Sequence, residues 1–320
     1  MDVIRWGIIG CGDVCEVKAG PAFQKVAHSE LVAVMRRTGA LAEDFAKRHG
    51  VAKWYDTVDA LLADPAVNAV YVATPPGAHE AIALQVCAAR KPCYLEKPAA
   101  RNLAETKRIV NAFTAAGVPL FVAYYRRGQA KFRRARELVR SGALGAVTSV
   151  NYALVRAPQA LPPAPAPLPW RLRARHAGGG LVMDVGCHTI DIVDFIAGEL
   201  RGARGVAARA RADGDGRYAV EDSVSLSARV GANAGAVCTM SWSFAGPRGT
   251  PERELITVRG TKGELRLSCF GGEPLELDTY GDGGERTQRV EPAETLRNTH
   301  YFSANALHCT QLRPRIAHSC

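Results

Sequence analysis

One stretch of the chain combines ionisable side chains with apolar neighbours, a pattern that indicates acid–base chemistry. In Met183-Asp184-Val185-Gly186-Cys187-His188 the aspartate and the histidine are four residues apart, so on a helix they share one face. Asp191 extends the motif onto a neighbouring face. Histidine has a pKa near neutrality and can exchange a proton with an alcohol or carbonyl oxygen. The flanking residues are largely apolar, and a buried charge needs a partner or a function. The alternative is a core histidine with internally satisfied hydrogen bonds.

A second set of polar groups follows two predicted strands. Thr74-Pro75-Pro76-Gly77-Ala78-His79 comes after the strand 69–73, and Glu96-Lys97-Pro98 comes after the strand 92–95. Ligands bind at the carboxyl ends of strands in open α/β sheets, so Thr74, Pro75, His79, Glu96 and Lys97 are candidate binding residues. The Lys97 ammonium can orient and polarise a reacting oxygen. A surface ion pair is the alternative, but it would not explain the adjacent proline, which fixes the backbone.

A glycine-rich turn near the N-terminus predicts a dinucleotide site. Ile8-Ile9-Gly10-Cys11-Gly12-Asp13-Val14-Cys15 follows a strand and opens a helix. Gly10 allows the tight turn, and Gly12 lets the backbone approach a pyrophosphate lying on the helix N-terminus, where Asp13 and Val14 stand. Cys15 replaces the third glycine of the fingerprint with another small residue. The alternative is a glycine turn that holds no ligand, but the strand–turn–helix context favours the dinucleotide.

The residues after the second strand predict which dinucleotide binds. An NAD site usually carries an acidic residue there, which bonds the ribose 2′-hydroxyl. This chain has Arg36-Arg37 instead. Two guanidinium groups attract a 2′-phosphate and can bind it with paired hydrogen bonds. We therefore expect a preference for NADP, with NAD as the alternative cofactor; the competing interpretation makes both arginines solvated residues at a helix start.

The first third of the chain has the pattern of a doubly wound α/β domain. Short apolar strands alternate with amphipathic helices, which predicts a parallel sheet covered on both faces. The predicted strands are 3–9, 31–35, 69–73, 92–95 and 120–123, and the predicted helices are 14–26, 40–49, 57–62, 78–89 and 103–116. We assign residues 1–124 to an NAD(P)-binding Rossmann domain.

After Tyr125 the pattern changes to that of an α+β domain with an open, largely antiparallel sheet. A basic helix at 129–140 precedes a strand at 147–155, and a proline-rich surface loop spans 158–169. Gly178-Gly179-Gly180, which we interpret as room for a substrate, leads into a helix at 181–196. Alternating segments at 223–230, 236–243, 254–259 and 264–267 predict strands, the last two joined by the turn 260–263. We assign 125–297 to substrate binding and oligomerisation and 298–320 to an atypical tail.

Composition narrows the classes of function. The formal net charge is +10, but the basic residues are spread, and the clearest cluster, 131–136, lies on a predicted helix without an aromatic stacking motif of the RNA-binding kind beside it. We therefore expect no nucleic-acid partner. No apolar run reaches membrane-spanning length and no signal peptide is evident, so we expect a cytoplasmic protein. The nine cysteines are scattered without zinc-ligand spacing, which predicts reduced thiols and no metal site.

Taken together, the glycine fingerprint, Thr-Pro-Pro-x-x-His, Glu-Lys-Pro and Asp-x-Gly-x-His resemble the Gfo/Idh/MocA oxidoreductase family over roughly residues 3–290. The resemblance implies that Lys97, Asp184 and His188 line the nicotinamide pocket. Tyr124 and Arg126, at the end of the last Rossmann strand, are candidate substrate ligands; domain-interface packing is the alternative. The residues do not decide whether His188 or Lys97 carries the proton.

We therefore predict an NADP-preferring oxidoreductase acting on a secondary alcohol or carbonyl of a sugar, polyol or cyclic diol. A non-catalytic NAD(P)-binding sensor is the alternative. The open sheet predicts a homodimer or homotetramer, because exposed sheet edges and faces are usually covered. The tail from about Arg297 lacks the closing helices usual in the resembled family, so we expect that the original C-terminus has been replaced and that the tail packs poorly.

Overall fold

The structure is a computed structural model, and it describes residues 3–211, 217–231, 235–249, 251–281 and 284–290. These residues divide into two compact units, one ending at Tyr125 and one beginning at Arg126. The tail predicted at 298–320 lies outside the described residues. Within the described ranges, no helix has the length and apolar character needed to cross a membrane.

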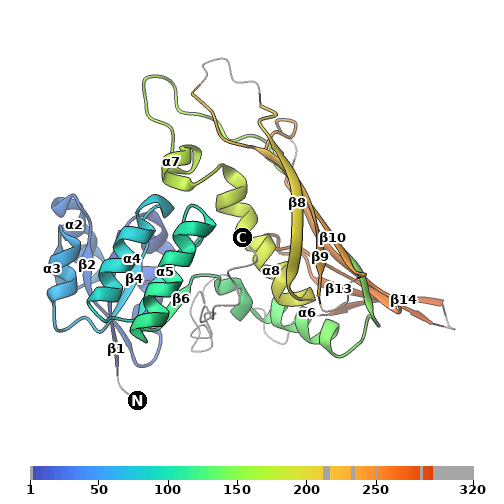
Figure 1. The fold of residues 1–320 in the computed structure, drawn as a ribbon, viewed down its shortest axis with the longest axis horizontal. Helices are drawn as coiled ribbons and strands as arrows, with labels where there is room; N and C mark the ends of the chain where they lie inside the picture. Colours follow the sequence, from blue (N-terminus) through green and yellow to red (C-terminus); the bar gives the residue numbers. More distant parts are fainter. Residues whose placement is uncertain (1–2, 212–216, 232–234, 250, 282–283, 291–320) are drawn as a thin grey trace. The chain divides into compact units, whose positions relative to one another are not determined.

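The first unit contains a six-stranded parallel sheet in the order β3-β2-β1-β4-β5-β6 (Figure 1). Its strands are β1 Ile4–Ile9, β2 Ser29–Met35, β3 Lys53–Tyr55, β4 Ala69–Val72, β5 Cys93–Leu95 and β6 Leu120–Val122. Its helices are the π-helical η1 Cys15–Ala19, α1 Gly20–Lys25, α2 Gly39–His49, α3 Val58–Ala63, the short η2 Pro76–Ala78, α4 His79–Ala88 and α5 Leu103–Ala116. The predicted doubly wound Rossmann sheet is confirmed.

Both faces of this sheet are buried, because successive strand residues point to opposite sides. Ile8 and Tyr71 pack with Phe23 and Phe45 of α1 and α2 on one face. On the other face, the core gathers residues of α3, α4 and α5 against Ile9, Val70 and Val72. This two-sided burial explains why β4 consists entirely of buried residues.

The second unit contains an eight-stranded sheet in the order β14-β13-β12-β11-β7-β10-β9-β8. Its strands are β7 Val147–Val155, β8 Leu200–Ala208, β9 Ser223–Val230, β10 Val237–Ser243, β11 Arg253–Gly260, β12 Gly263–Leu267, β13 Leu275–Gly281 and β14 Gly284–Val290. Among the described strands, β10 and β7 run parallel and the other neighbours run antiparallel. The predicted α+β architecture is confirmed, with one parallel pair inside the sheet.

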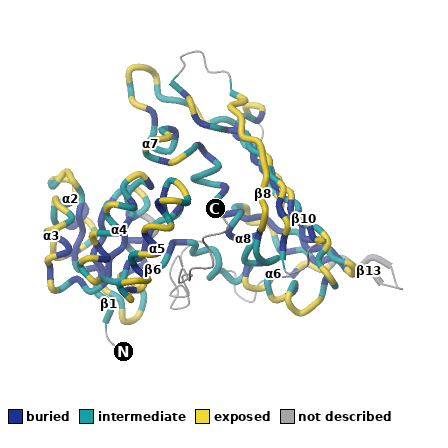
Figure 2. The backbone as a smooth tube through the Cα atoms, viewed as in Figure 1, coloured by how far each residue is buried: buried dark blue, intermediate teal, exposed yellow. Residues whose placement is uncertain are grey.

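The helical segments that follow β6 are η3 Tyr125–Gly128, α6 Ala130–Arg140, η4 Trp170–Leu172, α7 Ala174–Ala177, the π-helical η5 Val182–Gly186 and α8 Cys187–Ala197. Among them, α6 and α8 pack on one face of the second sheet. The core under α6 and α8 includes Phe132, Ile192, Tyr152 and Trp242. The opposite face is open, and β8 is exposed along almost its whole length (Figure 2).

The stretch predicted as one helix at 181–196 has two parts. A π-helical segment, Val182–Gly186, precedes the α-helix Cys187–Ala197. Gly186 allows the close approach to the sheet, because an added Cβ there would meet Val182 at 2.7 Å and the Trp242 indole at 3.2 Å. The π turn therefore lies at the residues that the sequence singled out for chemistry, as π-helical segments often do.

Candidate functional site

The glycine turn of the first unit is bonded directly to the end of β2. The N–H groups of Gly10 and Cys11 both donate to the Met35 carbonyl oxygen, at 2.9 and 3.3 Å. Gly10 has φ +92°, and an added Cβ would meet the Thr74 Cγ2 at 2.8 Å. A Cβ on Gly12 would meet only the Gly10 oxygen, at 3.9 Å, so the outer side of the turn is open. The turn thus has the exposed backbone that a pyrophosphate needs.

Arg36 follows Met35 and is electrostatically coupled to this turn. Burial raises the pKa of the Cys11 thiol to about 11, and the Arg36 guanidinium is the largest influence that opposes the rise. A guanidinium beside the glycine turn can meet the phosphates of a dinucleotide. Arg37 is exposed, and Thr38 follows it as the residue before α2.

Asp13, Val14 and Thr74 complete the part of this edge that fits a dinucleotide. Asp13 and Val14 begin the helical segment after the turn, and the first N–H groups of a helix have no partner within it. The Thr74 Oγ1 is buried without a hydrogen-bond partner among the described residues. A bound dinucleotide can satisfy both kinds of group, so these residues fit the cofactor that the sequence predicts.

His79 is fully buried and joins the two turns at this edge. Its Nε2 lies 2.7 Å from the Thr74 carbonyl oxygen, and its Nδ1 lies 3.0 Å from that of Pro98. Burial lowers the pKa of His79, and the positive charge of Lys97 acts in the same direction. The sequence selected His79 as a cofactor ligand, whereas the geometry gives both ring nitrogens backbone partners.

Glu96 and Tyr71 support the backbone that carries Lys97. The Tyr71 hydroxyl donates to Glu96 Oε1 at 2.6 Å, and the Lys97 N–H donates to Glu96 Oε2 at 3.0 Å. Tyr71 is buried, and burial together with the negative charge of Glu96 raises its pKa well above the usual value. The Lys97–Pro98 peptide bond is cis. Pro75, the residue before η2, lies in the same edge region after β4.

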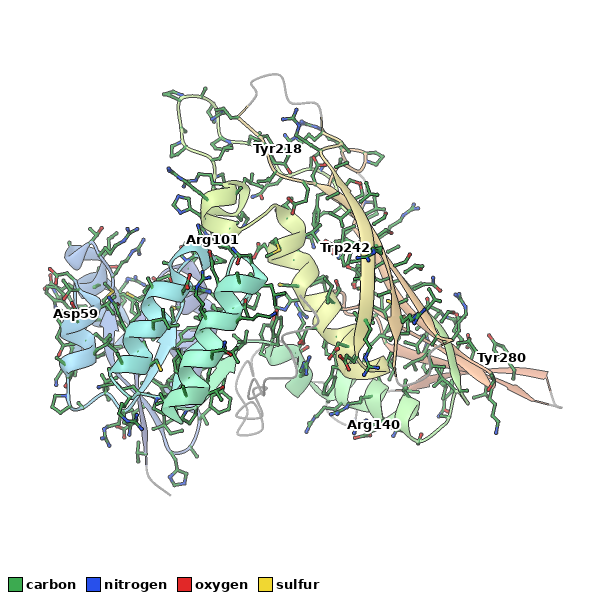
Figure 3. All side chains as sticks on the ribbon, viewed as in Figure 1. Asp59, Arg101, Arg140, Tyr218, Trp242 and Tyr280 are labelled. Atoms are coloured by element: carbon green, nitrogen blue, oxygen red, sulfur yellow. The ribbon has the colours of Figure 1, made fainter. Side chains whose placement is uncertain are left out.

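In the second unit, Asp184 lies on η5 and His188 on α8. The Asp184 carboxylate accepts a hydrogen bond from Arg171 Nε at 3.2 Å, and His188 is 7% exposed. The position of α8 is fixed by Trp242, whose Nε1 donates to the Thr189 hydroxyl at 3.1 Å. Figure 3 labels Trp242 on the side of the sheet that α8 covers. The residue next to His188 is thus hydrogen-bonded to the sheet.

The triple glycine has a packing role that differs from the predicted one. An added Cβ on Gly180 would overlap the backbone carbonyl oxygen of Glu221, and one on Gly179 would lie 2.6 Å from the Met183 Cγ. The Gly180 N–H donates to Glu221 Oε1 at 2.6 Å. Gly179 and Gly180 therefore let this backbone pack against the residues before β9. The structure shows internal packing at the position that we interpreted as room for a substrate.

Asp191 has a structural partner. Arg127 Nε donates to both of its carboxylate oxygens, at 2.8 and 3.0 Å. Burial raises the pKa of Asp191 to about 6 despite the positive charge of Arg127. Arg127 also lies over the ring of Phe195, at 5.4 Å. This ion pair joins η3 to α8.

Tyr124 and Arg126 fall in different units. The Tyr124 N–H donates to the Val122 carbonyl oxygen at 2.7 Å, which ends β6. Arg126 donates to the Cys269 carbonyl oxygen at 2.6 Å and lies over the Phe270 ring at 4.7 Å. Phe270 in turn meets His188 edge-on, with 6.1 Å between ring centroids.

The predicted site residues are thus divided between the two units. The first unit places the glycine turn, Arg36, Thr74, His79 and Lys97 at the carboxyl end of its sheet, and the second unit links Arg126 to His188 through Phe270. Sequence reasoning missed Arg171, Trp242 and Phe270, because each is connected to the motif only through contacts between distant segments. The Trp170-Arg171 pair directly after the proline-rich loop was the one local signal available.

Two family models match the chain. One, described as an oxidoreductase family with an NAD-binding Rossmann fold, matches residues 4–124, and one described as a GFO/IDH/MocA C-terminal domain matches residues 132–266. "Oxidoreductase P35" of Formosa agariphila is 34% identical over 267 residues, which are 83% of this chain and 80% of that protein.

Two further proteins share the similarity. A 1,5-anhydro-D-fructose reductase of Ensifer adhaerens is 30% identical over 221 residues, covering 69% of this chain and 64%, under two thirds, of that protein. The crystal structure of an aldose-aldose oxidoreductase from Caulobacter crescentus, complexed with glycerol, has a TM-score of 0.79 and 26% identity. It covers 96% of this chain and 88% of that one.

Proposed function

This chain belongs to the Gfo/Idh/MocA family of NAD(P)-dependent oxidoreductases, and we propose that it interconverts a secondary alcohol and a carbonyl of a sugar, polyol or cyclic diol. The observation that carries the proposal is the shared carboxyl edge of the first sheet, where the glycine turn follows β1, Arg36 follows β2 and Lys97 comes after β5. The relatives are oxidoreductases, so the alternative of a non-catalytic sensor has no support from them.

We propose NADP as the preferred cofactor. The Arg36 guanidinium lies close enough to the glycine turn to affect the Cys11 thiol, and no acidic residue stands at 36–38 to repel a 2′-phosphate. Arg37 is exposed beside it and adds a second positive charge. Gly10, Gly12, Asp13, Val14 and Thr74 would hold the pyrophosphate and its neighbours. NAD remains the alternative cofactor for the same turn.

In this proposal each of three side chains has its own role in the reaction: Lys97, Asp184 and His188. When bound, the nicotinamide ring supplies the hydride acceptor or donor. Lys97 polarises the carbinol or carbonyl oxygen, and His188 exchanges the proton with that oxygen. Asp184, oriented by Arg171, bonds a substrate hydroxyl. The pH dependence of turnover in the two single variants, His188→Asn and Lys97→Met, tests this assignment of the proton to His188.

The experiment is a turnover assay with NADPH or NADP⁺ and a panel of D-xylose, D-glucose, myo-inositol and 1,5-anhydro-D-fructose. We expect one class of polyol or carbonyl compound to change the absorbance of the reduced nicotinamide. Lys97→Met should abolish most of this change, since losing an acid–base or polarising group costs about 10²–10⁴ in rate. NADPH binding without turnover of any panel member, or a fully active Lys97→Met variant, would contradict the proposal.

We further propose a homodimer or homotetramer formed through the open face of the second sheet. One row across neighbouring strands consists of Val206, Ser225, Ser241, Ala153 and Leu255. Val206 is 74% exposed and Leu255 45%, so this row offers aliphatic side chains that a second copy of the chain would cover. Leu255→Lys should shift the sedimentation coefficient toward that of a monomer.

We also propose that the enzyme lies in the cytoplasm, a reducing compartment that suits its buried thiols such as Cys11 and Cys93.

A further inference from the structure

The loop after β12 is fixed from three sides by charged groups of the second unit. The Glu254 carboxylate accepts hydrogen bonds from the N–H groups of Cys269 and Phe270, at 2.7 and 3.0 Å. Arg126 donates to the Cys269 carbonyl oxygen at 2.6 Å. Lys131 donates to the carbonyl oxygen of Glu273 at 3.0 Å. The loop backbone is therefore bonded to η3, α6 and β11.

Two of the charged groups that hold this loop, Glu254 and Lys131, are costly to bury. Burial raises the pKa of Glu254 and lowers that of Lys131, so both side chains lose hydration in the folded protein. Groups that are this costly to bury indicate that the position of the loop matters to function.

Phe270 is the side chain whose position these bonds define. Its ring stands nearly perpendicular to the His188 imidazole, at an interplanar angle of 78° and a centroid distance of 6.1 Å. The Arg126 guanidinium lies over the ring at 4.7 Å, and that of Arg156 at 6.0 Å. Phe270 is only partly buried, whereas His188 is buried. The Phe270 ring therefore neighbours both the imidazole and two guanidinium groups.

We propose that Phe270 is a positioning residue for His188, and that Glu254 holds it in place. This inference rests on the proposed function, in which His188 exchanges the proton. The ring limits rotation of the imidazole and excludes water from one of its sides. A displaced imidazole would lie off the line to the reacting oxygen, and misplacement of about 1 Å can cost about 10²-fold in rate.

The first test uses kinetics. Phe270→Leu should lower kcat by about 10- to 100-fold and change the KM for NADPH by less than about twofold, because no cofactor contact is removed. Phe270→Tyr keeps the ring and should restore most of kcat. Phe195→Leu is the matched control, since Phe195 is a partly buried phenylalanine on α8 that also lies under two guanidinium groups, those of Arg127 and Arg136. It should leave kcat unchanged.

The second test needs neither substrate nor cofactor. In ¹H–¹³C spectra of the histidine rings, the His188 cross-peak is identified by its absence from His188→Asn. Removal of the neighbouring ring in Phe270→Leu should move this cross-peak, Glu254→Ala should move it in the same direction, and Phe195→Leu should leave it in place. An unmoved cross-peak in Phe270→Leu, or full kcat in that variant, would overturn the positioning role.

The two proposals fail in different ways. If His188→Asn loses turnover while Phe270→Leu keeps it, only the role of Phe270 is wrong. If both variants turn over the substrate as the unaltered protein does, the assignment of His188 is wrong as well.

Discussion

The guanidinium of Arg127 and the carboxylate of Asp191 form a buried ion pair inside the second unit, with 2.6 Å between Nη2 and Oδ1. Asp194 extends it, at 3.4 Å from the same nitrogen. The pair connects η3 to the helix that carries His188. The cost of burying Asp191 nevertheless exceeds the attraction of its partner, since its pKa is raised to about 6. This imbalance leads to a pH-dependent contribution to stability.

The folded chain holds the Asp191 proton more tightly than the unfolded chain, whose value is near 3.8. The stabilisation is therefore complete below pH 3.8 and is lost as pH rises through about 6. One pKa unit corresponds to about 1.4 kcal/mol, so the loss is at most about 3 kcal/mol. Relative to Asp191→Asn, the unaltered protein should lose free energy of unfolding over this interval, measured by urea denaturation at several pH values. Glu30→Gln, a change of an exposed carboxyl group in β2, should keep the slope. Parallel curves for the unaltered protein and Asp191→Asn would refute the assignment.

Cofactor preference should change when the positive charges after β2 are removed. A hydrogen bond to a charged group contributes about 1.5–3 kcal/mol, so losing one costs roughly tenfold in affinity. The double variant Arg36→Asp with Arg37→Ala should bind NADPH at least about tenfold more weakly and narrow or reverse its preference over NADH. Lys47→Ala, which removes an exposed charge from α2, serves as the control. Equal dissociation constants for the two cofactors in the unaltered protein would rule out the preference.

Gly180→Ala should destabilise the protein, because the new methyl group would overlap the Glu221 carbonyl oxygen. Overpacking of this kind costs about 1–3 kcal/mol or more. Gly235 is the matched control, since an added Cβ there meets nothing within 4 Å. Thermal unfolding of the two alanine variants checks the prediction. Equal melting temperatures would mean that the chain moves aside and that the glycine has another role.

His79→Leu should lower stability because it removes both contacts of the imidazole with the Thr74 and Pro98 carbonyl oxygens. A buried polar group left without a partner costs about 1–3 kcal/mol. Urea denaturation measures the loss against His28→Asn, a change of an exposed histidine whose φ of +60° asparagine tolerates. A His79→Leu variant as stable as His28→Asn would show that the carbonyl oxygens find other partners.

Periodic burial made much of the fold predictable. The strand 147–155 and the strand 223–230 were predicted with the bounds that the structure has, because their residues alternate between a buried and an open face. The strand β3 was missed because Lys53-Trp54-Tyr55 is a short edge strand, with Trp54 41% exposed. The strand β8 was missed because its small and basic residues are exposed and show no alternation.

The candidate site was predictable where neighbours in sequence also make the contacts. The glycine turn, Thr74 and Lys97 follow strands whose order in a doubly wound sheet places them at one edge. The role of Gly180 was misinterpreted because the residue against which its backbone packs, Glu221, is more than 40 residues away in the sequence. Phe270 was missed for the same reason, since its contact with His188 spans two segments that no local pattern connects.

The most direct test of the proposed function follows a labelled hydride. The unaltered protein is mixed with NADPH deuterated at the transferable position and the carbonyl form of the panel compound that it turns over, and the product is analysed by mass spectrometry. We expect the carbinol carbon of the product to carry the deuterium, and Lys97→Met and His188→Asn to yield little product while still binding NADPH. Product without deuterium, or unchanged deuterium transfer by both variants, would contradict the account.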